Sequence, residues 1–311
     1  MSEFRTIREL CSVVVDCPHS TPKWTANGKI VIRNNNIKHG RIDFSSPSYT
    51  DDEHFAQRIK RAKPQPGDII ITREAPIGDV GMIPENTECC LGQRMVLLRA
   101  NQSVCDNFYL LYSLQSLYVQ HQISWSEGTG TTVSNLRIPH LEQIQIPYFP
   151  LEQQAKISSV LRALEEKIEN NRRLNDNLQQ QAQAIYSSMF IDNSESAWTH
   201  GHLSDLVTVK YGKDHKKLSE GIYPVYGSGG IMRYVERPLY DKESVLIPRK
   251  GTLNNVMYVN QPFWSVDTMF YTEMKLPNVA KFVYHFVKAK DLASMNAGSA
   301  VPSMTTDILN A

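Results

Sequence analysis

The sequence contains few cysteines and no long apolar segment. Its five cysteines all fall in the first half, and an odd number that includes the adjacent pair Cys89 and Cys90 argues against a framework of disulfides. No apolar stretch reaches the length needed to cross a membrane, and the opening residues MSEFRTIREL lack the apolar core of a signal peptide. We therefore expect a cytoplasmic protein with reduced thiols and no membrane partner.

The sequence also has no excess of charge of one sign. Its 33 lysines and arginines face 32 aspartates and glutamates, which gives a net charge of +1. This balance excludes a uniformly basic surface for nucleic acid. Any nucleic-acid role therefore requires positive residues that cluster locally within each domain.

Motifs for enzymatic chemistry are missing as well. The glycine-rich segments 128–132 and 227–230 lack the lysine of a phosphate-binding loop, and the histidines and carboxylates show no HExxH or paired-acid spacing. Residues 260–263 are similar only in part to the Asn-Pro-Pro-Tyr/Phe loop of adenine methyltransferases, because Gln261 interrupts the pattern. We expect no catalytic residue in this chain.

A zinc site is conceivable at Cys11, Cys17 and His19. Their spacing lacks the short CxxC pairs that hold structural zinc. We therefore expect neither a metal nor a cofactor bound by this chain.

A long amphipathic helix is the clearest positive signal. Residues 152–190 contain no glycine or proline, and they follow Pro147 and Pro150, which cannot continue a helix upstream. At 1.5 Å per residue such a helix reaches about 58 Å, which exceeds the width of one small domain. Its apolar residues alternate steps of four and three, as in a coiled coil. The predicted helix interface includes Ile157, Leu161, Leu164, Ile168, Asn171, Asn175, Leu178 and Ile185.

Two asparagines, Asn171 and Asn175, interrupt this apolar seam at its middle. Polar residues in a coiled-coil core lower stability while they fix register and the number of partners. Two interpretations stay open. The amides pair across an interface between helices, or the helix lies on its own domains and both asparagines face water.

The segments before and after the helix repeat the same order of signals. The first half has an amphipathic opening, a strand pair, an apolar helix and a glycine-containing closing segment at 4–15, 67–83, 107–116 and 128–141. The second half has the same signals at 200–212, 243–259, 281–289 and 298–309. The sequence therefore predicts an α+β fold with two β-rich globular domains, 1–150 and 193–311, separated by a long coiled-coil-type helix in a spacer, 151–192.

An arginine follows a predicted buried strand in each half. Arg73 follows IIIT, and Arg249 follows VLIP. A basic side chain at the end of a rigid strand, beside a glycine turn, is well placed to meet a phosphate or a guanine edge. The alternative is that both arginines only solvate a strand end.

Several segments resemble the specificity (S) subunits of type I restriction-modification enzymes. Residues 138–190, which contain IPHLEQIQIPYFPLEQQAKI and the heptad helix, are similar to the first conserved spacer of that family. YPVYGSGGI (223–231), LIPRKGTLNNVMYV (246–259) and FWSVDTMFY (263–271) are similar to a pattern common in its target-recognition domains. The resemblance covers almost the whole chain, and its spacer motif is the more specific part.

The resemblance implies a non-catalytic subunit that selects double-stranded DNA for other subunits. Each target-recognition domain would read one half of a split sequence, and the spacer would set their separation and dock two methyltransferase (M) subunits. Those subunits would carry S-adenosylmethionine, and a restriction (R) subunit would use ATP and Mg²⁺.

The chain departs from the family pattern after residue 309. The family continues into a second long helix, antiparallel to the first, whereas this sequence ends at Ala311. We expect either a truncated form or a second polypeptide that supplies the missing surface. The unpaired seam predicts self-association or dependence on the M subunit.

Polar residues beside turns are the candidate DNA contacts, because asparagine can pair with adenine and arginine with guanine, while lysine and threonine meet the backbone. In the first domain they are Arg33, Asn34, Asn35, Asn36, Arg73, Thr129, Thr131 and Thr132. In the second they are Lys213, Lys216, Lys217, Tyr226, Ser228, Arg233, Arg249, Lys250, Asn254 and Asn255. For each residue the alternative is ordinary turn chemistry.

Three functions stay open. The first is a sequence-specific DNA-binding subunit without catalysis. The second is a truncated S-like assembly scaffold that binds methyltransferase but recognises DNA poorly. The third is an enzyme with an undetected methyltransferase site, which would require binding of S-adenosylmethionine by the isolated chain.

Overall fold

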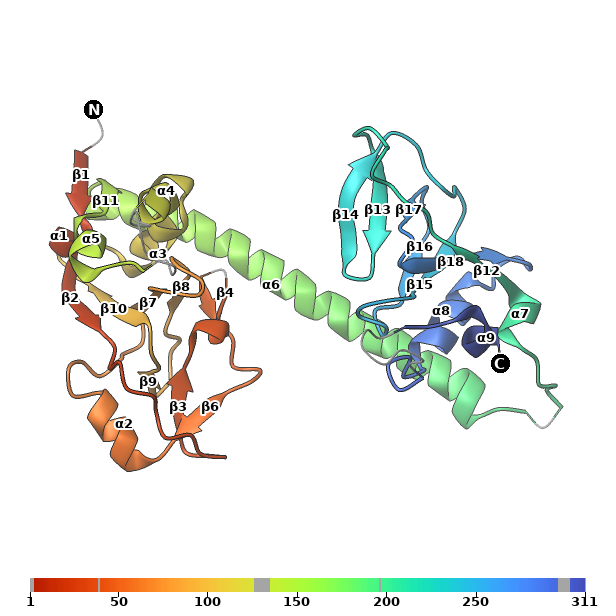
Figure 1. Ribbon diagram of the computed structural model, residues 1–311, viewed down its shortest axis with the longest axis horizontal. Helices are drawn as coiled ribbons and strands as arrows, with labels where there is room; N and C mark the ends of the chain where they lie inside the picture. Colours follow the sequence, from red (N-terminus) through yellow and green to blue (C-terminus); the bar gives the residue numbers. More distant parts are fainter. Residues whose placement is uncertain (1–2, 39, 126–134, 196, 296–302, 311) are drawn as a thin grey trace. The chain divides into compact units, whose positions relative to one another are not determined.

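The computed structural model describes residues 3–38, 40–125, 135–195, 197–295 and 303–310 (Figure 1). The chain divides into two compact units, Met1–Asn171 and Arg172–Ala311, which we call the first unit and the second unit. Both contain sheets and helices, and one helix of 37 residues continues from the first unit into the second. The predicted α+β class, with two domains and a long helix between them, is confirmed.

The first unit is built on a four-stranded antiparallel sheet. Its strands follow the order β2 (Cys11–Asp16), β10 (Met95–Ala100), β7 (Ile69–Thr72) and β8 (Val80–Met82). Alternate residues of a strand point to opposite faces. Ile69 and Ile71 join one hydrophobic core, while Ile70 joins another. Burial of both faces explains why the IIIT segment is apolar at consecutive positions.

Helices cover one face of this sheet. They are α1 (Ile7–Leu10), α3 (Asn107–Gln115), α4 (Leu117–Trp125) and α5 (Ile138–Gln143), and Figure 1 shows them at the same end of the unit as the antiparallel pair β1 (Glu3–Thr6) and β11 (Gln145–Tyr148). Helix α3 begins after Asp106, whose carboxylate accepts a hydrogen bond from the Tyr109 amide at 2.8 Å. This cap satisfies one of the amides that the first helical turn leaves free.

A smaller sheet packs on the opposite face. It has the order β6 (Ser48–Thr50), β3 (Lys29–Ile32) and β9 (Cys89–Leu91). The long connection from β3 to β9 includes η1 (Asn34–Asn36), β4 (Ile37–Lys38), β5 (Arg41–Ile42) and α2 (Asp52–Arg58). Strands β3 and β9 are parallel, with Ile32 opposite Leu91. The residues that follow these two strands therefore emerge at the same edge of the sheet.

The second unit repeats this topology. Its large sheet has the order β12 (Val207–Tyr211), β18 (Met269–Met274), β15 (Ser244–Pro248) and β16 (Met257–Val259), and its small sheet has the order β14 (Gly230–Val235), β13 (Tyr223–Gly227) and β17 (Trp264–Ser265). Its helices are α7 (Leu203–Leu206), α8 (Ala280–Lys288) and α9 (Thr306–Asn310). In each unit the last large-sheet strand lies beside the first, and the small sheet contains one parallel pair. The strand orders thus confirm the internal repeat.

The long helix α6 (Leu151–Ser187) is followed directly by a π-helical turn, η2 (Ser188–Asp192). In the first unit Gln154 and Ser158 of α6 are buried against the domain. In the second unit Tyr186 of α6 is buried and stacks on His285 with ring centroids 5.8 Å apart. One helix therefore supplies packing residues to both cores.

Most of the predicted helix interface is open to solvent. Ile157 packs partly against the first core, whereas Leu161, Leu164, Ile168, Asn171, Asn175, Leu178 and Ile185 are exposed. Leu164 and Ile185 show 57% and 60% of their surface, which is unusual for large apolar side chains. None of the described helices has the length and apolar content to span a bilayer.

Candidate nucleic-acid interface

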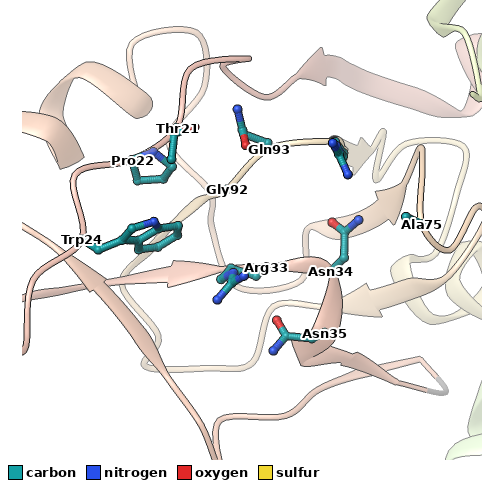
Figure 2. A pocket seen from close by; sticks show the side chains of 10 residues that line it. Thr21, Pro22, Trp24, Arg33, Asn34, Asn35, Ala75, Gly92 and Gln93 are labelled. Atoms are coloured by element: carbon teal, nitrogen blue, oxygen red, sulfur yellow. The ribbon is translucent and has the colours of Figure 1, made fainter.

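A polar pocket of about 490 Å³ lies where β3 and β9 end in the first unit. Its lining residues are Thr21, Pro22, Trp24, Arg33, Asn34, Asn35, Ala75, Gly92, Gln93 and Arg94. Figure 2 shows Pro22 and Trp24 on one side, Asn34 and Ala75 on the other, and Arg33 between them. Three of the predicted DNA contacts therefore share one pocket.

The pocket presents donors and acceptors of the kinds that read base edges. The Arg33 guanidinium lies 5.2 Å from the centroid of the Trp24 ring, a cation–π contact that restrains the arginine without using its donors. Asn35 is exposed. Arg94 is also exposed, and its Nε donates to the Glu74 carboxylate at 3.2 Å. Free guanidinium and amide groups side by side can pair with guanine and adenine respectively.

Two lining residues have a strained backbone. Ala75 has φ +46° and Arg94 has φ +65°, both in the left-handed region that side chains with a Cβ rarely adopt. Gly92 is required for a different reason, because a Cβ at this position would approach the carbonyl oxygen of Ile32 to 2.9 Å. Strain of this kind concentrates at functional sites, which supports the assignment of the pocket.

Asn34 and Asn36 serve the local structure. Asn36 is buried, its Oδ1 accepts from the Arg33 amide at 2.9 Å, and its Nδ2 donates to the Asp43 carbonyl at 3.0 Å. The side chain of Asn34 donates to the Glu74 carbonyl at 2.6 Å but still borders the pocket. Asn36 is therefore withdrawn from the candidate DNA contacts, because its amide is fully engaged in holding the turn.

Arg73 is also structural. Its Nη1 donates to Asp16 at 2.7 Å, its Nε donates to the Leu136 carbonyl at 2.9 Å, and its side chain is only 11% exposed. The guanidinium thus connects the end of β7 to the end of β2 and to the segment at Leu136. The predicted contact with DNA is corrected accordingly, because Nε, Nη1 and Nη2 of Arg73 all donate to groups of the protein itself.

Arg249 occupies the equivalent position after β15 and has a different environment. It is partly exposed, lies over the Tyr211 ring at 5.3 Å and donates one hydrogen bond to the Asp267 carbonyl at 3.2 Å. Among the described residues no carboxylate pairs with it. Arg73 is buried and paired with an aspartate, whereas Arg249 is partly exposed and donates to a main-chain carbonyl. Arg249 therefore remains a candidate for contact with DNA.

The loop after β15 meets the tip of the β13–β14 hairpin. Asn255 Nδ2 donates to the Ser228 carbonyl at 2.8 Å, and a Cβ on Gly251 would meet Ser228 Oγ at 2.8 Å. Lys250 is exposed beside Arg249 in the same loop. The structure therefore brings Ser228, Arg249, Lys250 and Asn255 together as the candidate surface of the second unit.

The remaining candidates of the second unit are divided. Lys213, Lys216 and Lys217 are exposed in the segment between β12 and β13 and remain candidates for phosphate contacts. Arg233 is partly buried and donates to the Leu218 carbonyl at 3.1 Å. Asn254 is occupied at both ends of its amide, by Asp291 and by the Ala293 amide, each at 3.0 Å.

Tyr226 belongs to the core of the second unit. It is 9% exposed and packs edge-on against Phe263. Tyr226 joins the same hydrophobic core as its neighbour Val225, so the predicted DNA contact is corrected to a packing role. Thr129, Thr131 and Thr132 lie outside the described residues.

Sequence reasoning missed seven of the ten lining residues of the pocket, and Trp24, Gln93 and Arg94 are those among them with large polar or aromatic side chains. Gln93 and Arg94 follow strand β9 and Gly92, and the prediction of Arg249 as a DNA contact used the same signal, a polar residue after a strand and beside a glycine. Trp24 gave no such signal, because its role depends on the cation–π contact with Arg33.

The five cysteines are buried or half-buried thiols in the first unit. All five cysteines are free, and burial raises the pKa of Cys89 and of Cys105 to about 12, so both stay protonated thiols. In the described parts of the chain no group of three or more His, Cys, Asp or Glu side chains is placed to hold a metal ion.

Comparison with known proteins gives the same family for both units. The type I restriction modification DNA specificity domain matches residues 2–180 and 195–311. A protein of Methanocaldococcus jannaschii named as a type I restriction enzyme specificity subunit is 31% identical over 118 residues, 38% of this chain and 27% of that protein. A protein of Mycoplasma genitalium named as a type I specificity subunit is 28% identical over 177 residues, 51% of this chain and 45% of that protein. The matches thus span less than half the length of these relatives.

A solved structure supports the fold. The crystal structure of the S subunit of a type I restriction-modification system from M. genitalium matches with a TM-score of 0.61 at 20% identity, and the match covers 100% of this chain and 83% of that one. Because the family pattern covers both units almost completely, this chain belongs to the type I restriction modification DNA specificity domain family.

Proposed function

We propose that this chain is the non-catalytic DNA-specificity subunit of a type I restriction-modification system. Each unit reads one half of a bipartite double-stranded target. Residues 1–150 and 193–311 form the two target-recognition domains, and residues 151–192 form the spacer. The pocket formed by Arg33, Asn35 and their neighbours is the observation that carries this proposal, because it places guanidinium and amide groups at one sheet edge.

The second unit supports the proposal through its topology. Its small sheet has the same strand order and the same parallel pair as the first, so its loops and turns occupy equivalent positions. Ser228, Arg249 and Asn255 lie together beside these turns. Two copies of one frame with different polar residues are what recognition of two different half-sites requires.

Assembly with M subunits uses the exposed seam of α6. Leu164, Ile168 and Leu178 are each more than half exposed, and the buried residues of this helix, Gln154, Ser158 and Tyr186, lie near its two ends. Burial of such side chains stabilises a complex at roughly 25 cal/mol per Å² of apolar surface. In this proposal S-adenosylmethionine belongs to the M subunits and ATP with Mg²⁺ to the R subunit, which joins through the complex.

The proposal is tested by titration of labelled duplex DNA with the chain, alone and with the M subunits of its own system, at several salt concentrations. Sequence-specific recognition predicts affinity that falls with salt and a cognate duplex that binds at least about 10³-fold more tightly than a scrambled one. Complex formation with equal affinity for every duplex would instead indicate an assembly scaffold. Saturable binding of S-adenosylmethionine by the isolated chain would contradict the non-catalytic assignment.

A further inference from the structure

A buried arginine donates hydrogen bonds to the main chain of two segments next to the pocket. Arg58 is the last residue of α2, and only 6% of its surface is exposed. No carboxylate accompanies it: every acceptor recorded for its guanidinium in the described part of the chain is a main-chain carbonyl. Burial lowers the pKa of Arg58, but a guanidinium stays charged at neutral pH. The side chain is therefore a buried, uncompensated positive charge, an arrangement that proteins rarely keep without a reason.

The four carbonyls belong to the two chain segments that lead into the pocket. Nε donates to Leu91 at 2.7 Å and Nη2 donates to Gly92 at 2.9 Å. On the other side, Nη1 donates to Ser20 at 2.9 Å and Nη2 also donates to Pro18 at 3.1 Å. Gly92 lines the pocket itself, and Ser20 directly precedes the lining residue Thr21. One guanidinium thus joins both segments, residues 18–24 and 91–94, which we call the two walls of the pocket.

A second contact joins the same two segments at the surface. The side-chain amide of Gln93, a lining residue, donates to the main-chain carbonyl of His19. At one end the two segments are joined through the main chain, because β2 pairs with β10 as far as Asp16 and Val96 and the Cys17 amide donates to the Met95 carbonyl at 3.0 Å. The Pro18–Ser20 segment that follows lies outside the described strands. Beyond Cys17 the two walls are therefore joined by the side chains of Arg58 and Gln93.

We infer that Arg58 is a positioning residue for base recognition by the first unit. This role rests on the proposed function and adds a positioning residue to it. Arg58 does not touch DNA; its planar fork holds the walls at the spacing at which Arg33 and Asn35 can meet base edges. Recognition groups held in place before binding lose less conformational entropy when they bind. The buried charge also raises the positive potential of the pocket, which favours the electronegative edge of guanine.

The substitution Arg58→Lys tests this role. Lysine keeps the positive charge but has three donors on one rotating ammonium, so it cannot hold four carbonyls in a fixed fork. The matched control is Arg99→Lys. Arg99 lies in the same unit outside the pocket lining and pairs with the buried Asp68 through two hydrogen bonds of 2.7 and 2.8 Å. Both variants replace a guanidinium that makes several hydrogen bonds, but only the guanidinium of Arg58 bonds a residue that lines the pocket.

The first readout is the base preference of bound duplexes, selected from a randomised pool by the chain with its M subunits. Arg58→Lys is expected to reduce the preference at one half-site by about 10- to 100-fold, the value of one or two base contacts, and to leave the other half-site unchanged. Arg99→Lys is expected to leave both half-sites unchanged. An unchanged profile for Arg58→Lys, or equal losses in both variants, overturns the inference.

The second readout does not depend on DNA. Hydrogen exchange of residues 18–24 and 91–94 is expected to rise in Arg58→Lys while exchange in β7 and β10 stays as in the wild type. Unchanged exchange at both walls overturns the inference even if DNA recognition fails. Absence of any selected motif with the wild type, together with the expected rise in exchange, instead contradicts the proposed function and leaves the wall-holding role of Arg58 intact.

A second variant covers the case in which Arg58→Lys does not fold. Gln93→Ala removes the surface contact between the walls without disturbing the buried charge. It is expected to weaken preference at the same half-site as Arg58→Lys. Full retention of that preference overturns the claim that the clamped walls matter for recognition.

Discussion

Gln154 Oε1 accepts a hydrogen bond from the main-chain amide of Asp106 at 2.9 Å, and this contact ties the long helix to the first unit. Gln154 is fully buried, and its Nε2 donates to the carbonyls of Val104 and Phe149 at 3.0 and 2.7 Å. Ser158, one turn later, donates to the Asp106 carboxylate at 2.7 Å. The Glu-Gln-Gln motif of the spacer therefore has a structural explanation, because its last residue satisfies three buried main-chain groups.

Gln154→Leu should destabilise the first unit by about 3 kcal/mol. The substitution leaves the Asp106 amide and two carbonyls buried without partners, at roughly 1–3 kcal/mol for each unsatisfied group after partial relaxation. The free energy of opening is measured by hydrogen exchange in β7 and β10. The neighbouring exposed residue gives the control, since Gln153→Leu should change this free energy by less than about 0.5 kcal/mol. Equal effects of the two substitutions would refute the role of Gln154.

Asn35→Ala and Arg33→Ala should each change base discrimination without changing stability. Both side chains are exposed, so each loss should cost less than about 0.5 kcal/mol of folding free energy. Each should reduce discrimination at one base position by about 1–3 kcal/mol. The control is Arg8→Ala, which removes an exposed arginine outside the pocket that pairs with Glu142 at 3.1 Å. If Arg8→Ala alters the base profile as much as the pocket variants, the pocket is not the reading site.

Substitution of the exposed seam should separate assembly from folding. The double variant Leu164→Gln and Leu178→Gln removes two side chains that are 57% and 51% exposed, so thermal stability of the isolated chain should be nearly unchanged. Self-association and affinity for the M subunit should fall at least about 30-fold, as for loss of a hot spot worth 2 kcal/mol. Sedimentation measures both. Leu117→Gln, at a leucine that is 90% exposed on α4, is the control and should leave assembly intact.

Stability of the first unit should decline as the pH falls from about 4.5 to about 2. Hydrogen bonds from Lys29 and Lys63 lower the pKa of Glu88 to about 2, and the amide of His54 lowers that of Asp51 to about 2. A carboxylate whose folded pKa lies below its unfolded value stabilises the fold above the unfolded pKa, and this contribution disappears as the pH falls through the folded pKa. Urea unfolding midpoints should therefore decrease over this range. Glu88→Gln should make the decrease shallower, and an identical pH profile in that variant would count against the Glu88 contacts.

The fold could be predicted from periodicity and repetition. The heptad spacing of α6 and the matching order of signals in the two halves depend on local patterns, and the structure has both. The pocket could be predicted only in part. Arg33 and Asn35 stood out as polar residues in a turn, but Trp24 and Gln93 join them through the parallel pairing of β3 and β9 and through long-range contacts.

Arg73 and Arg249 show the limit of the sequence most clearly. Both follow an equivalent strand, yet Arg73 pairs with Asp16 from β2, while in the described ranges of the chain no carboxylate pairs with Arg249. The difference lies in a residue more than fifty positions away along the chain. Local signals identified the strand ends correctly but could not distinguish a buried ion pair from an available cation.

The most direct test is sequencing of the duplexes that the chain, with its M subunits, retains from a pool with a fully randomised central region. Two short conserved blocks separated by a gap of constant length and random sequence are the predicted result. A single continuous motif would contradict reading by two separate units, and a retained pool with no enriched sequence would contradict sequence-specific recognition altogether.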